Sequence, residues 1–96
     1  MSSISIENPE RPTILDEAKE IVRGRGKQEY GDPEAHFELV SELWSSYIGA
    51  PVTSKDVTML MILYKTAREK NQHKRDNLVD IAGFSFCGAK VTGDDR

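Results

Sequence analysis

The stretch GDPEAHFELVSELWSSYIG, residues 31–49, decides the fold class. Asp32 is a strong helix N-cap, Pro33 suits the first helical position, and Gly49 stands where a C-cap glycine is expected. Between these ends the apolar residues recur at helical spacing, at Phe37, Val40, Trp44, Tyr47 and Ile48. The stretch therefore predicts one amphipathic helix with a defined start and a defined stop.

A second helix is predicted before this one. Thr13 can cap it, with Asp16 three residues later as a weaker form of the capping box, and Gly24 and Gly26 end it. Its apolar residues share one face: Leu15, Ala18, Ile21 and Val22.

Two further helices are predicted after residue 50. The third helix in chain order opens at Thr53 or Ser54 and is apolar on every side over residues 59–64, so it is central or faces a partner as well as its own core. The fourth runs from about Arg75 to Lys90. Its inward residues are expected to be Leu78, Ile81, Ala82 and Ala89.

No segment shows the sustained alternation of a strand, so we expect an all-α, four-helix domain over residues 13–92. Residues 1–12 are expected to form a flexible arm and residues 93–96 a polar tail. A four-helix chain this short offers only a shallow cleft, so a homodimer that forms a larger helical bundle is expected.

Composition limits the class of protein. Ninety-six residues allow one domain, and the formal net charge of −3 argues against a general nucleic-acid coat, although a local basic patch stays open. The single Cys87 excludes an internal disulfide and a Cys-based zinc finger. No apolar run approaches the roughly 20 residues that span a bilayer, and no secretory signal precedes the first helix. We therefore expect a cytoplasmic protein without membrane contact.

The linker GRGKQEYGDP, residues 24–33, is the first candidate site. Basic residues flanked by glycines resemble phosphate cradles, but neither the Walker A nor the dinucleotide spacing is present. Either the linker is an ordinary interhelical loop with Tyr30 folded onto the core, or Tyr30 and Asp32 contact a nucleotide.

Opposite charges on the last two helices form the second candidate site. Lys65 and Arg68 follow the apolar run, and Asp76 and Asp80 lie four residues apart on one side of the final helix. One interpretation is a set of interhelical salt bridges. The other is that Asp76 and Asp80 hold Mg²⁺ while Lys65 and Arg68 bind nucleotide phosphates.

Three glutamates on the helix after Asp32 extend the second interpretation. Glu34, Glu38 and Glu42 repeat every four residues, which is typical of a solvated face. If this ridge faces the final helix instead, Glu38 and Glu42 complete the metal site. His36 and His73 lack a second ligand at zinc spacing.

Four segments together resemble a family of small, mostly phage and prophage proteins of uncharacterised function, associated with nucleotide modification. The segments are EAKEIVRGRGKQEYGDPEAHF, LW, DVTMLMILYKTAR and RDNLVDIAGF, and the similarity covers residues 14–90. The group is distantly similar to the all-α MazG-like nucleoside triphosphate pyrophosphohydrolases. In place of the E-x-x-E and E-x-x-D motifs of those enzymes, this chain has Glu38-x-x-x-Glu42 and Asp76-x-x-x-Asp80. The resemblance implies these site positions: Tyr30, Gly31, Asp32, Lys65, Arg68, Asp76 and Asp80.

Two functions are the main candidates, and a purely structural dimerisation unit is a third possibility. The first is a phage-type nucleotide-binding protein, in its enzymatic form a Mg²⁺-dependent pyrophosphohydrolase with Asp76 and Asp80 as catalytic residues. The second is a small acidic binding module that inhibits a host or defence complex in the infected bacterial cell. Exposed Trp44 or Tyr47 beside Glu38 and Glu42 would suit that second role.

Overall fold

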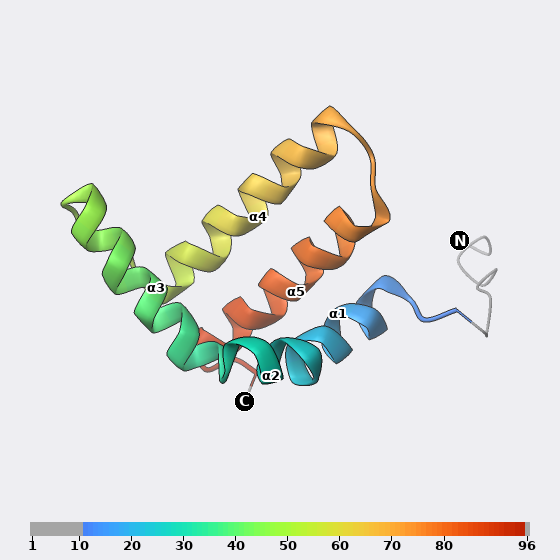
Figure 1. Ribbon diagram of the computed structural model, residues 1–96, viewed down its shortest axis with the longest axis horizontal. Helices are drawn as coiled ribbons and strands as arrows, with labels where there is room; N and C mark the ends of the chain where they lie inside the picture. The colour runs from blue at the N-terminus through green and yellow to red at the C-terminus, as the bar shows by residue number, and fades with distance from the viewer. Residues whose placement is uncertain (1–10, 96) are drawn as a thin grey trace.

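The computed structural model describes residues 11–95, and all regular structure within that range is helical (Figure 1). Most of the predicted N-terminal arm therefore lies outside the described residues. The helices are α1 (Ile14–Arg23), α2 (Arg25–Tyr30), α3 (Pro33–Ile48), α4 (Ser54–Asn71) and α5 (Arg75–Thr92). The all-α class and the four long helices are confirmed.

Two reciprocal capping boxes fix the starts of α1 and α4. The Asp16 N–H donates to Thr13 Oγ1 at 3.0 Å, and the Thr13 N–H donates back to the Asp16 carboxylate at 3.4 Å. The Asp56 N–H donates to Thr53 Oγ1 at 3.1 Å, and the Thr53 N–H donates back to the Asp56 carboxylate at 3.0 Å. Thr53, rather than Ser54, is thus the N-cap of α4.

The ends of α3 follow the sequence prediction with one difference. Asp32 occupies the N-cap position and Pro33 begins the helix, but within the described range the Asp32 side chain makes no capping hydrogen bond. Gly49 ends the helix in the left-handed region at φ 78°, a conformation that costs glycine little. Gly31, at φ 80°, makes the corner between α2 and α3.

The loop predicted over residues 24–33 is wrong in part, because it contains the six-residue helix α2. The Gln28 N–H donates to the Gly24 carbonyl at 3.1 Å, and the Gly31 N–H donates to the Lys27 carbonyl at 2.9 Å. The structure describes every residue of α2 and none is buried. A helix without a buried stripe has no apolar period, so the pattern that predicted the other helices was silent here.

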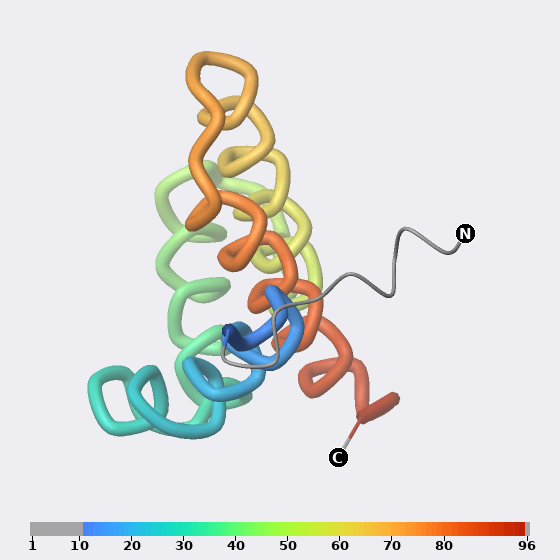
Figure 2. The backbone as a smooth tube through the Cα atoms, turned by 90° about the vertical axis from the view of Figure 1, so that its right-hand side faces the viewer, coloured from blue at the N-terminus to red at the C-terminus, as the bar shows by residue number. Residues whose placement is uncertain are grey.

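The long helices α4 and α5 run antiparallel and form the most extensive helix pair (Figure 1). Helix α1 packs across α5, and α3 contacts the first half of α4 and then diverges from it (Figures 1 and 2). The buried core cluster joins four helices through Val22, Phe37, Val57 and Cys87. Among residues 11–95, no helix is long and apolar enough to cross a membrane.

The inward face of α5 differs from the predicted one. Leu78 was expected inward but is 37% exposed, whereas Val79 and Asn77 beside it are buried. The Asn77 amide can be buried because its Nδ2 donates to Glu69 Oε1 at 3.0 Å. Tyr47 and Leu15, also expected on core-facing stripes, are exposed.

Candidate functional site

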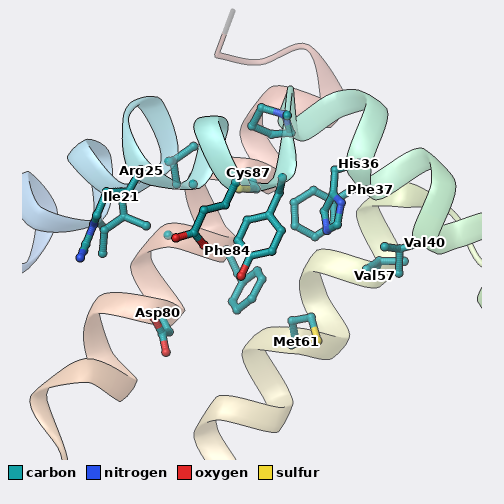
Figure 3. A pocket seen from close by; sticks show the side chains of 18 of the residues that line it. Ile21, Arg25, His36, Phe37, Val40, Val57, Met61, Asp80, Phe84 and Cys87 are labelled. Atoms are coloured by element: carbon teal, nitrogen blue, oxygen red, sulfur yellow. The ribbon is translucent and has the colours of Figure 1, made fainter.

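A cavity of about 650 Å³ lies where all five helices meet (Figure 3). Its apolar wall comes chiefly from α3, α4 and α5, through Phe37, Val40, Val57, Met61 and Phe84. Figure 3 shows Met61 and Val57 on α4 across the cavity from Asp80 and Phe84 on α5. The small residue Gly83 also lines the cavity, and a Cβ there would meet no atom closer than 3.8 Å.

Aromatic rings line one side of the cavity in a continuous row. The Tyr30 and His36 ring centroids lie 5.5 Å apart and the rings are tilted by 42°. His36 meets Phe37 edge-on at 5.3 Å, and Phe37 meets Phe84 edge-on at 6.2 Å. Tyr30, at the outer end of the row, is 63% exposed.

Charged groups line the same cavity. Arg25 and Glu29 come from α2, Lys65 from α4 and Asp80 from α5. Lys65 Nζ lies 3.0 Å from Asp80 Oδ2, with the two side chains 19% and 37% exposed. The interhelical ion pair between these residues is therefore present, and the pair also forms part of the cavity wall. The position of Lys65 and Asp80 is thus compatible with both interpretations, the interhelical salt bridge and the ligand site.

Five other predicted site residues lie apart from this cavity. They are exposed, and among the described residues none of them lines it: Asp32, Glu38, Glu42, Arg68 and Asp76. Arg68 and Asp76 also make no ion pair within residues 11–95. The wider salt-bridge set thus reduces to Lys65 with Asp80.

The carboxylates do not gather as the predicted metal site requires. Among residues 11–95, no three His, Cys, Asp or Glu side chains lie close enough together to hold a metal ion. Two carboxylates line the cavity, those of Glu29 and Asp80. The magnesium assignment stays a prediction.

Cys87 lines the cavity but is not suited to nucleophilic chemistry. Burial raises the pKa of its thiol to about 11, so the thiol stays protonated at neutral pH. Cys87 instead acts as a small apolar residue of the buried core cluster.

Sequence reasoning undervalued Arg25, Glu29 and His36. Arg25 and Glu29 are four residues apart, which places them on one side of a helical turn once α2 is recognised. Tyr30 and His36 stand on either side of the Gly31 corner, a signal for two rings brought together by a turn. The missing information was that residues 25–30 are helical.

Two phage proteins are similar to the chain over most of its length. The Gene 55 protein of Mycobacterium phage L5 is 41% identical over 75 residues, which are 76% of this chain and 48% of that protein. The Gene 55 protein of Mycobacterium phage D29 is 35% identical over 80 residues, 82% of this chain and 53% of that protein. The chain spans about half the length of these curated relatives.

No solved structure matches the chain. Residues 13–92, which include every helix described above, match the family described as "Domain of unknown function (DUF6378)". The chain is a homologue of the two phage proteins and belongs to the DUF6378 family.

Proposed function

We propose that the chain binds a nucleotide in the five-helix cavity. The observation that carries the proposal is that an aromatic pair, Tyr30 and His36, and two cations, Arg25 and Lys65, line one largely apolar cavity. A nucleotide combines a flat aromatic base with a polyanion, and these side chains match both parts. The cavity volume of about 650 Å³ also falls in the range of about 300–1,000 Å³ that is usual for small-molecule sites.

The base stacks on the exposed ring of Tyr30 in this proposal. Stacking of a base on an aromatic side chain contributes about 1–3 kcal/mol and tolerates every base. His36 packs against the Tyr30 ring with the two rings tilted by 42°, and in this proposal it positions the stacking surface. The apolar wall accepts the parts of the base and sugar that lie beyond the ring.

The phosphates meet Lys65 and Arg25. Lys65 exchanges its partner on binding, from the Asp80 carboxylate at 3.0 Å to a phosphate oxygen. Asp80 is then free to hold, together with Glu29, the Mg²⁺ ion that accompanies a nucleoside triphosphate. The enzymatic form of the proposal adds hydrolysis, in which water attacks the α-phosphate and pyrophosphate leaves, as in MazG-like enzymes.

A thermal-shift panel of nucleoside mono- and triphosphates, with and without Mg²⁺, tests the proposal. We expect a nucleotide-dependent rise in melting temperature. Lys65→Met should weaken binding about 10- to 100-fold, because a charge-assisted hydrogen bond is lost. Arg68→Met, on the same helix but outside the cavity lining, is the matched control and should bind as the wild type does.

Tyr30→Ala and Tyr47→Ala form a second matched pair. Both tyrosines are exposed, at 63% and 94%, but only Tyr30 belongs to the cavity lining among the described residues. Equal losses of affinity in the two variants, or no response to any nucleotide at millimolar concentration, would overturn the proposal. Release of pyrophosphate and nucleoside monophosphate from the triphosphates with Mg²⁺ measures the enzymatic form separately.

The outer face of α3 supports a second candidate function, a binding module for another protein. Leu39, Leu43 and Tyr47 repeat every four residues there and are 54%, 60% and 94% exposed. Exposed apolar stripes of this kind mark interaction sites. Trp44 is half-buried against the core, so Tyr47 rather than Trp44 would be the anchor.

Acidic residues border this stripe and define the partner. Glu38 and Glu42 are exposed beside Leu39 and Leu43, so a complementary partner has an apolar groove flanked by Arg or Lys. Affinity between the chain and such a partner, once purified, should fall as salt rises. It should also fall in Leu43→Glu but not in Tyr30→Ala. A complex that ignores both salt and Leu43→Glu would contradict this function.

A further inference from the structure

The solvent side of α4 carries a regular stripe that the cavity does not use. We call its members the outer stripe: Asp56, Leu60, Leu63, Ala67 and Lys70. Their spacing of four, three, four and three residues is the spacing of a coiled-coil seam. Leu60 and Leu63 are 43% and 63% exposed, although Val57 and Thr58 on the other side of the helix are buried.

The sequence predicts that α4 is either central or faces a partner as well as its own core, and the exposure of its side chains favours a partner. A helix apolar on every side either lies at the centre of its fold or faces a partner as well. Helix α4 packs against α5 along its length and against α3 over its first half (Figure 1). Met59 and Tyr64, which flank the outer stripe, are also 40% and 53% exposed. The side of α4 that carries the outer stripe is thus apolar and open to solvent.

The charges of the outer stripe are arranged with opposite signs about its centre. Asp56 and Lys70 each lie seven residues from Leu63, one toward the N-terminus and the other toward the C-terminus. Hydrogen bonds from Thr53 lower the pKa of Asp56, so this carboxyl is ionised at neutral pH. Two copies of α4 laid antiparallel about Leu63 bring each Asp56 within about one turn of the other copy's Lys70. A parallel pairing would instead place like charges together.

We propose that the outer stripe of α4 binds a second copy of this chain, antiparallel, with a twofold axis near Leu63. A twofold interface must be complementary to itself, and the sequence of acid, three apolar residues and base meets that condition. This self-complementary order of charges is required for a twofold pairing of identical chains and is not required for binding to a different protein.

The exposed area predicts how tight the dimer is. Four large apolar side chains on each copy, Met59, Leu60, Leu63 and Tyr64, each expose on the order of 100 Å². The two copies together bury about 800 Å² of apolar surface, to which a polar rim adds, and interfaces below about 1,200 Å² are typical of weak, transient complexes. We therefore expect a reversible dimer whose population rises with concentration.

The dimer and the cavity occupy opposite sides of α4. The cavity is lined by Val57, Met61 and Lys65, none of which belongs to the outer stripe. Nucleotide binding and dimer formation are therefore independent in this proposal, and either can fail without the other. Lys65→Met should leave the dimer unchanged.

Sedimentation equilibrium of the full chain over a wide concentration range tests the dimer. We expect a monomer–dimer equilibrium in which Leu63→Glu raises the dissociation constant at least tenfold. Leu15→Glu is the matched control, because Leu15 is 73% exposed on α1 and should leave the dimer intact. Lys70→Glu places a second acid opposite Asp56 of the other copy, so this variant should also weaken the dimer. A monomer at every concentration, or a dimer that resists Leu63→Glu, would overturn the proposal.

Cysteine cross-linking in a Cys87→Ala background tests the orientation. Leu63→Cys lies at the proposed axis and should form an intermolecular disulfide under mild oxidation. In an antiparallel pair the two Lys70→Cys residues, one on each chain, lie far apart, so this variant should not form an intermolecular disulfide. Efficient cross-linking through Lys70→Cys would show a parallel pairing and contradict the charge argument.

Discussion

Substitution of two glycines in α5 by alanine tests the packing of the helices that form the cavity. Gly83 and Gly88 both lie inside the helix. Each loses more backbone freedom on folding than alanine does, so Gly→Ala alone should stabilise by about 1 kcal/mol. Their surroundings differ. A Cβ at Gly83 meets only Val22 Cγ2 at 3.8 Å, an ordinary contact, so Gly83→Ala should keep the full gain.

Gly88 lies at a close contact between α5 and α4. A Cβ there lies 3.1 Å from Thr58 Oγ1 and 3.6 Å from Met59 Cε. Thr58 is fully buried, and its hydroxyl donates to the Lys55 carbonyl at 2.7 Å, so it cannot easily turn away. Overpacking of this kind costs about 1–3 kcal/mol, which offsets or exceeds the gain. Gly88→Ala should therefore be about 1–3 kcal/mol less stable than Gly83→Ala.

Urea unfolding followed by far-UV circular dichroism measures the difference. For a domain of this size, Gly83→Ala should also raise the melting temperature by about 4–8 °C. Adding Thr58→Ala to Gly88→Ala should recover part of the loss, and the double-mutant cycle gives the coupling. Equal stability of the two glycine variants would refute the close α4–α5 contact on which the cavity depends.

Three further predictions concern single side chains. The hydrogen bond from His73 is the main cause that lowers the pKa of Glu69 to about 2, so its contribution to stability should be lost as pH falls from about 4.5 toward 2. Glu69→Gln should remove this part of the acid sensitivity in urea unfolding at several pH values. Because burial raises the pKa of Cys87 to about 11, iodoacetamide should modify the native thiol far more slowly than the unfolded one. Arg75 binds the Glu17 carboxylate and joins α5 to α1, so Arg75→Gln should lower the free energy of unfolding by about 0.5–1 kcal/mol, and less at high salt.

The sequence predicted those helices whose ends carry a specific chemical signal. Thr13 and Thr53 are followed three residues later by aspartates, and both form the expected caps. Gly49 adopts the left-handed conformation that its position required. Helix α2 was not predicted, because six residues without a buried face give no apolar periodicity and the two glycines nearby favour a loop.

The candidate site was predictable only where two helices were certain to be neighbours. Lys65 and Asp80 follow from the pairing of consecutive antiparallel helices, and they do meet. The direction of Glu38 and Glu42 depends on how far α3 is rotated about its axis. An apolar stripe on both sides of α3, with Phe37 buried and Leu43 exposed, left that rotation undetermined.

¹⁵N-resolved NMR titration of the full chain with a Mg²⁺-nucleoside triphosphate tests whether a nucleotide occupies the five-helix cavity. We expect saturable shifts of the amide signals of Tyr30, His36 and Gly83 and little change at Leu63 on the outer stripe. Unchanged spectra at millimolar ligand, or shifts confined to residues outside the cavity lining, would contradict the account.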